Sequence, residues 1–204
     1  MGVRMLKEIK RKIIHLIGLF IPICYYFFRE EDKIIAVFIL LSLTAIYFSL
    51  ELLRLTNKRA QRYFLTHFST LLRTHEKQKI TGTGYYLLSA LLSVSLFKKE
   101  LAIACLSFLI LGDMFAAIIG TRFGRTKIIA GKSLEGSLAC FIVCFVIGLF
   151  VAWLFPTTHL NLQIIAVGAL TATIVELLPL GIDDNLTIPL ISGLVMEIVI
   201  YIAF

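Results

Sequence analysis

One carboxylate, Asp113, lies inside an apolar stretch and is followed by small residues and then by cations. Ala116, Gly120 and Gly124 recur every three or four positions, so they share a helical face with Asp113. Ionisable side chains inside apolar spans are costly and are usually functional. A carboxylate, a smooth helix face and nearby cations are the parts needed to hold a magnesium-bound polyphosphate at a membrane surface.

The segment after this helix supplies the cations. Lys127 and Lys132 are predicted to clamp phosphates, whereas Arg122 and Arg125 either do the same or anchor the helix end. Glu135 is a candidate for binding a metal or a ribose, or for orienting Lys132. The two glycines also fit a second interpretation, because small residues four apart let membrane helices pack closely.

A second acidic cluster follows a later apolar stretch. It contains Glu176, then Asp183 and Asp184 with Asn185 beside them. Oxygen ligands of this kind suit a hard cation such as Mg²⁺. A solvated turn that caps the next helix is the alternative.

The composition determines what must position these residues. Of the 204 residues, 59% are hydrophobic and 16% are charged, against about 45–50% and 25% in soluble domains. The chain is therefore predicted to be one all-α membrane domain over residues 1–204. The net charge of +7 could indicate nucleic acid, but its distribution indicates membrane orientation instead, and no nucleic-acid partner is expected.

Seven membrane spans are predicted from the apolar stretches, since about 20 helical residues cross a bilayer. They cover residues 11–28, 34–53, 81–97, 101–122, 136–155, 163–180 and 187–204. The connections on one side carry most of the lysines and arginines. The positive-inside rule then places the N-terminus in the cytoplasm and the C-terminus outside.

The linker over residues 54–80 has apolar side chains at helical spacing with basic residues around them. The apolar residues are Phe64, Leu65, Phe68, Leu71 and Leu72, and the basic residues are Lys58, Arg59, Arg62 and Arg73. This pattern predicts a basic interfacial helix on the cytoplasmic surface. A solvated connector packed on the bundle is the alternative.

These residues carry a resemblance to a known family. Asp113-x-x-Ala116-x-x-x-Gly120-x-x-x-Gly124, followed by Lys132-Ser133-x-Glu135-Gly136, is similar to the signature of membrane enzymes that use CTP on lipids. Two branches share it: the dolichol, phytol and polyprenol kinases, which include CTP-dependent diacylglycerol kinases, and the phosphatidate cytidylyltransferases.

Shorter motifs resemble the kinase branch. They are Arg11-Lys12-x-x-His15, Glu51-x-x-Arg54, and Glu176 followed by Asp184-Asn185 and Pro189. Position 133 is Ser where cytidylyltransferases usually have Thr, and Ala130-Gly131 replaces their Pro-Lys. Both departures make a cytidylyltransferase a less favoured interpretation than a kinase.

The resemblance implies a kinase that transfers the γ-phosphate of CTP to a membrane-embedded lipid alcohol such as a polyprenol, dolichol or phytol, with Mg²⁺ as cofactor. Four residues are the catalytic candidates: Asp113, Lys132, Glu135 and Asp184. The nucleotide is expected at Gly120, Arg122, Gly124, Lys127, Lys132, Ser133 and Asn185. Metal ligands are expected among Asp113, Glu176, Asp183 and Asp184, with Lys12, His15, Glu51 and Arg54 in support.

Several alternatives stay open at this point. The proton acceptor is Asp113, Asp184 or His15. A phosphatidate cytidylyltransferase that makes CDP-diacylglycerol is the second function, and a transporter or channel that uses Asp113 and Glu176 is the third. The compact length suits a prokaryotic inner membrane with the site facing the cytoplasm, and a homodimer is left open.

Overall fold

The computed structural model describes residues 15–68, 76 and 78–203. The helices run in chain order as α2 (Phe20–Phe27), α3 (Lys33–Thr56), α4 (Lys58–Phe68), α5 (Gly82–Leu96), α6 (Lys99–Ser107), α7 (Asp113–Arg122), α8 (Leu134–Leu154), α9 (Leu162–Leu177) and α10 (Asp184–Ala203). Short 3-10 turns precede α2 (Leu16–Leu19) and α3 (Glu30–Asp32), and a π-helical turn, Phe108–Gly112, joins α6 to α7. The all-helical prediction is confirmed for these residues.

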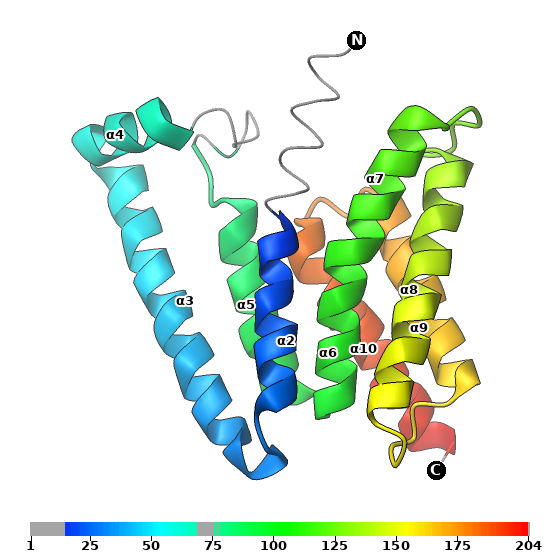
Figure 1. The fold of residues 1–204 in the computed structure, drawn as a ribbon. Helices are drawn as coiled ribbons and strands as arrows, with labels where there is room; N and C mark the ends of the chain where they lie inside the picture. Colours follow the sequence, from blue (N-terminus) through cyan, green and yellow to red (C-terminus); the bar gives the residue numbers. More distant parts are fainter. Residues whose placement is uncertain (1–14, 69–75, 77, 204) are drawn as a thin grey trace.

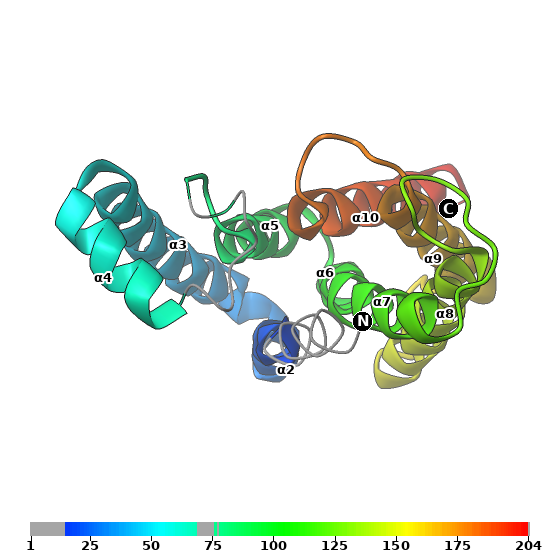
Figure 2. The same ribbon diagram turned by 90° about the horizontal axis from the view of Figure 1, so that it is seen from above.

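The long helices run in a common direction, and α4 crosses them at one end (Figure 1). Seen along that direction, α3 lies at one side of the molecule and α7, α8 and α9 at the other, with α5 and α10 between them (Figure 2). Contacts follow the same row, from α3 to α5, α10, α9, α8 and α7. The helices therefore form a curved row around α6.

The centre of the bundle is α6 and the π-helical turn. Leu101, Leu106 and Leu109 are fully buried there, and neighbouring α2, α5, α8 and α10 all contact α6. A π-helical turn holds one residue more than a regular turn, and such turns occur often at functional sites. Asp113 is the first residue after it, so the turn sets the direction in which this carboxylate projects.

Four helical segments are long and apolar enough to cross a membrane: Glu30–Thr56, Lys99–Arg122, Leu134–Leu154 and Asp184–Ala203. Three shorter apolar helices, Leu16–Phe27, Gly82–Leu96 and Leu162–Leu177, correspond to the other predicted spans. Large apolar side chains such as Phe38, Trp153 and Tyr201 are exposed on the outside of the bundle, as expected for surfaces in contact with lipid. The count of seven spans and their orientation stay predictions.

The predicted interfacial segment contains the helix α4 over the residues that the structure describes. Asn57 caps α4 by accepting hydrogen bonds from the backbone N–H groups of Arg59 (2.8 Å) and Ala60 (3.3 Å). The guanidinium group of Arg54 lies over the ring of Phe64, with its Cζ atom 5.3 Å from the centre of that ring. One side of α4 therefore packs on the end of α3. Leu71, Leu72 and Arg73 of the pattern lie outside the described residues.

Glycines allow α7 and α8 to approach closely. A Cβ atom on Gly136 would lie 2.8 Å from the carbonyl oxygen of Ala116 and 3.2 Å from Cα of Gly120, and one on Gly120 would lie 3.1 Å from Oγ of Ser133. Gly120 and Gly124 thus contact the start of α8. This is the close-packing role of glycines in membrane helices, and the predicted contact of their backbone with nucleotide stays a prediction.

Gly136→Ala is therefore expected to lower stability by about 1–3 kcal/mol, because the neighbouring atoms are backbone and the helices must move apart. Thermal melting of the purified protein in detergent micelles measures the change. Leu138→Phe on the exposed face of the same helix is the control and should melt like the wild type. Equal melting of the two variants would contradict the close approach described here.

Candidate functional site

Lys132, two residues before α8, contacts two other helices through a cluster of charges. Its Nζ lies 3.0 Å from Oε1 of Glu176 on α9 and 3.7 Å from Oδ2 of Asp184 at the start of α10. The same Nζ donates a hydrogen bond to the backbone carbonyl oxygen of Glu176. Glu176 is buried, whereas Lys132 and Asp184 are each about one third exposed. The structure thus brings together three residues that the sequence predicted to share a site.

Two further carboxylates lie within electrostatic range of Asp184, namely Asp113 on α7 and Asp183 in the preceding turn. Four of the predicted acidic residues therefore lie near one another, and two of them, Glu176 and Asp184, pair with Lys132. Among the described residues, no three His, Cys, Asp or Glu side chains are arranged to hold a metal ion by themselves. Mg²⁺ in nucleotide enzymes is commonly held by one or two carboxylates, with substrate phosphates and water completing its shell. The donor set fits that mode of binding.

The segment between α7 and α8 folds into a narrow hairpin that presents Lys132. Lys127 pairs with Ser133, Ile128 N–H donates to the Lys132 carbonyl oxygen (2.9 Å), and the hairpin turns at Gly131, whose φ is +81°. Arg122, Arg125 and Lys127 are exposed. The end of the hairpin nearest α8 carries Lys132 into the charge cluster, and phosphate binding by the other cations stays a prediction.

Ser133 and Glu135 hold this hairpin to α8. Oγ of Ser133 accepts a hydrogen bond from Gly136 N–H (3.2 Å) and so caps the helix. The Glu135 carboxylate accepts from Thr126 N–H at 3.1 and 3.3 Å. Both side chains thereby shape the segment that carries Lys132. Their predicted contacts with nucleotide or metal stay predictions.

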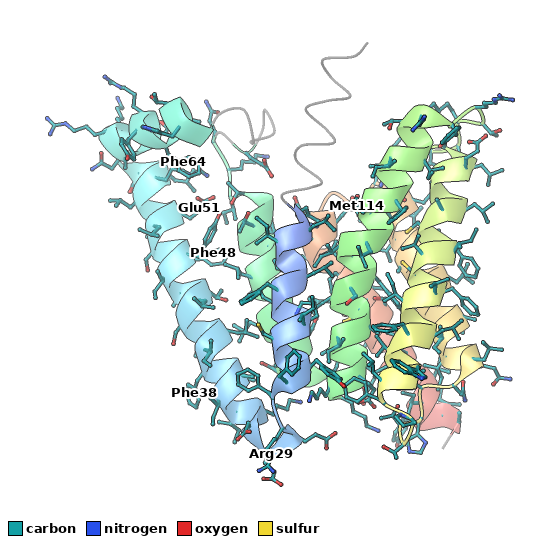
Figure 3. The ribbon with its side chains drawn as sticks, in the orientation of Figure 1. Arg29, Phe38, Phe48, Glu51, Phe64 and Met114 are labelled. Carbon is teal, nitrogen blue, oxygen red and sulfur yellow. The ribbon has the colours of Figure 1, made fainter. Side chains whose placement is uncertain are left out.

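A second buried network lies where α3 meets α4. Arg54 donates to the Glu51 carboxylate through Nε and Nη2, both at 2.8 Å, and also to the backbone carbonyl oxygens of Glu76 (3.2 Å) and Lys79 (2.7 Å). Glu51 in turn accepts from Thr81 N–H at 2.8 Å. Glu51 and Phe64 lie at the end of α3 that α4 crosses, and Met114, which follows Asp113, lies in the same half of the molecule (Figure 3).

This network extends to the start of α10. Glu76 accepts a hydrogen bond from Gly82 N–H (3.0 Å). A Cβ atom on Gly82 would lie 2.6 Å from Nδ2 of Asn185, so Asn185 packs directly on this backbone. Asn185 follows Asp184, and the Arg54 network therefore helps to position one carboxylate of the Lys132 cluster.

A pocket of about 270 Å³ lies between these two networks. One side of it is the segment before α5, with Lys79 and Ile80, together with Tyr85 of α5, and the other is formed by residues 181–184, where α10 begins. Asp184 therefore belongs to both the pocket and the Lys132 cluster. Sequence reasoning did not single out Lys79, Tyr85 or Glu76.

The motif Arg11-Lys12-x-x-His15 lies only partly within the residues that the structure describes. His15 lies beside Tyr86 of α5, with 6.2 Å between the ring centres, and Tyr86 donates to the carbonyl oxygen of Gly18 (2.6 Å). The segment from His15 to Gly18 thus contacts α5. Lys12 lies outside the described residues.

Residues 3–179 match the model of the cytidylyltransferase family. The chain belongs to this family. Its model covers the signature from Asp113 to Gly136 and Glu176, which is the part of the sequence that carries the resemblance. No solved structure matches the chain.

Proteins similar to the chain include named lipid kinases. The chain is 31% identical to CTP-dependent diacylglycerol kinase 1 of Saccharomyces cerevisiae over 95% of its own length and 73% of that protein. It is 34% identical to phytol kinase 1 of Arabidopsis thaliana, over 56% of this chain and 42% of the kinase. An uncharacterised protein of Rickettsia prowazekii is 30% identical over 90% of both chains. The predicted relation to CTP-dependent lipid kinases is confirmed.

Lys132→Met is expected to destabilise the protein by about 2–3 kcal/mol, because it leaves the buried Glu176 carboxylate without its cation. The double variant Lys132→Met/Glu176→Gln should recover most of this loss, since a neutral amide remains. Unfolding free energies of both variants in micelles provide the measurement. If the double variant is no more stable than Lys132→Met, the ion pair does not account for the loss.

Arg54→Lys is expected to lower stability by about 1–3 kcal/mol, although the charge is kept. An ammonium group cannot reproduce the planar fork that reaches Glu51 and two carbonyl oxygens together. Arg59→Lys on the exposed part of α4 is the matched control. Equal unfolding free energies for the two variants would show that the fork geometry is unimportant.

Proposed function

We propose that this protein is a CTP-dependent lipid kinase that transfers the γ-phosphate of CTP to the hydroxyl group of a membrane lipid. The observation that carries the proposal is the cluster of Lys132, Glu176 and Asp184 at one end of an apolar bundle. A lipid alcohol reaches such a place from the bilayer, and a nucleotide reaches it from water. The named lipid kinases among its relatives support the same activity.

In the proposed reaction the lipid hydroxyl oxygen attacks the γ-phosphorus of CTP. The bond from this phosphorus to the β–γ bridging oxygen breaks, which gives the lipid monophosphate and CDP. The hydroxyl proton passes to a side-chain acceptor, for which the carboxylates of Asp113 and Asp184 and the imidazole of His15 are the candidates. Such transfers depend mainly on positioning and on stabilising charge.

Lys132 has the place required for charge stabilisation. Its ammonium group already balances Glu176 and Asp184 and would also attract phosphate oxygens entering the site. Mg²⁺ held by Asp113, Asp183, Asp184 or Glu176 together with the phosphates would neutralise further negative charge. We assign the cytoplasmic face to this end, because the basic α4 lies there (Figure 1).

For the acceptor we propose a lipid alcohol with a long apolar chain. The sequence resemblance indicates an isoprenoid alcohol such as a polyprenol, dolichol or phytol. The yeast relative is named for diacylglycerol, and this lipid also presents one hydroxyl group on an apolar body. Both kinds of acceptor use the same phosphoryl step.

A second candidate function is cytidylyl transfer to phosphatidate, which the description of the family favours. There, a lipid phosphate would attack the α-phosphorus and release pyrophosphate. An anionic nucleophile needs cations more than a proton acceptor, so the two reactions make different demands on Asp113.

Labelled CTP separates the two reactions. Purified protein with Mg²⁺ receives CTP labelled on the α- or the γ-phosphate, together with a polyprenol, diacylglycerol or phosphatidate. If the protein is a kinase, the label from the γ-phosphate appears on an alcohol and CDP is the second product. Label from the α-phosphate on phosphatidate, with pyrophosphate released, would establish the cytidylyltransferase instead.

Asp113→Asn is expected to lower turnover by at least about 100-fold, because the amide keeps the shape but loses both the negative charge and the proton affinity. Asp32→Asn, in the 3-10 turn before α3, is the matched control and should keep full activity. Initial rates with saturating CTP and lipid give the comparison. Normal turnover by Asp113→Asn would refute the assigned role of this carboxylate.

A further inference from the structure

The pocket beside Asp184 has lining residues of several chemical kinds. It combines a cation (Lys79), an aromatic phenol (Tyr85), an apolar residue (Ile80) and two carboxylates (Asp183 and Asp184). Lys79 is exposed and Tyr85 is half-buried. We propose that this pocket receives the nucleoside part of CTP, with Tyr85 against the base or ribose and Lys79 beside the α-phosphate. The inference rests on the proposed use of CTP.

The position of the pocket fits a nucleotide that spans two adjacent sites. Asp184 lines the pocket and is also 3.7 Å from Nζ of Lys132. Terminal phosphates bound at Lys132 would therefore leave the rest of the nucleotide next to the pocket. The Lys132 cluster and the pocket share this residue, so one ligand can occupy both.

The size and polarity of the pocket favour a nucleoside over a lipid chain. Its volume of about 270 Å³ is slightly below the usual range of about 300–1,000 Å³ for sites that enclose a whole ligand. Part of a nucleotide is an appropriate occupant. The lysine and the carboxylates would be costly partners for a hydrocarbon chain, whereas an aromatic ring and cations are common partners of bases and phosphates.

The wall that carries Lys79 is held in place by buried hydrogen bonds. Arg54 binds the carbonyl oxygen of Lys79 at 2.7 Å, and Glu51 accepts from Thr81 N–H at 2.8 Å. The hydroxyl oxygen of Tyr47 lies 2.5 Å from the hydroxyl oxygen of Thr81, at hydrogen-bond distance. The backbone is thus fixed while the Lys79 side chain remains available. A pre-formed wall loses little freedom when a ligand binds.

Calorimetric titration of CTP and Mg²⁺ into the full-length protein in detergent micelles tests the proposal without any lipid acceptor. Lys79→Ala and Tyr85→Ala are each expected to raise the dissociation constant by about tenfold, and Tyr85→Phe should bind like the wild type because it keeps the ring. Steady-state assays should show the same rise in KM for CTP with an unchanged KM for the lipid.

Matched controls come from the opposite end of the bundle. Lys98→Ala and Tyr201→Ala remove an exposed lysine and an exposed tyrosine there, and both should retain wild-type affinity for CTP. Circular dichroism and size-exclusion chromatography check that every variant is folded. If Tyr85→Ala is not folded, Lys79→Ala, which changes an exposed side chain, still decides the question.

The outcomes separate this inference from the proposed function. Wild-type dissociation constants and KM values for CTP in folded Lys79→Ala and Tyr85→Ala would overturn the nucleoside pocket while the kinase stands. A raised KM for the lipid alone would make the pocket a lipid site, which also overturns the inference. Failure of the wild type to transfer phosphate to any lipid alcohol would refute the proposed function, and the titration would still report on CTP binding.

Discussion

A buried carboxylate among apolar helices must be paired, and the rest of the site depends on how Glu176 meets this requirement. Its partner, Lys132, comes from the hairpin before α8 and also lies near Asp184 at the start of α10. One cation thereby joins the ends of three elements that are far apart in the sequence. Because an unpaired charge in such surroundings is costly, the pairing fixes where α9 ends and α10 begins relative to the hairpin.

The buried hydrogen-bond network around Arg54 also fixes chain segments relative to one another. It lies on the other side of the molecule and takes no part in the charge cluster. Arg54 and Glu51 satisfy backbone groups of the segment before α5, and Gly82 lets Asn185 pack against that segment. The two networks meet at adjacent residues, Asp184 and Asn185. The beginning of α10 is consequently positioned from both sides, which is the kind of support that a site with demanding geometry requires.

The sequence was sufficient for the helical class and for several partners at the site, and the reasons are physical. Composition and apolar length identify membrane helices because lipid imposes both. The grouping of Lys132, Glu176 and Asp184 could be predicted because charges in apolar chains must find one another. The sequence did not reveal Lys79 or Tyr85, since a lysine in a basic linker and a tyrosine in an apolar helix have no distinctive pattern. A close pair such as Gly82 and Asn185 arises from tertiary packing alone.

The π-helical turn at Phe108–Gly112 has a consequence for how an irregular element can exist inside a bilayer. One additional residue rotates everything that follows by about 100° relative to an uninterrupted α-helix. Asp113 is thereby turned toward a different neighbour, while the chain continues to cross the membrane as a helix. A loop would achieve the same rotation only by exposing N–H and C=O groups to hydrocarbon, where they have no water to bind. A helical wheel that uses the same residues per turn from Lys99 to Arg122 therefore fails for this segment. It places side chains before and after the π-helical turn on one face although they point in different directions.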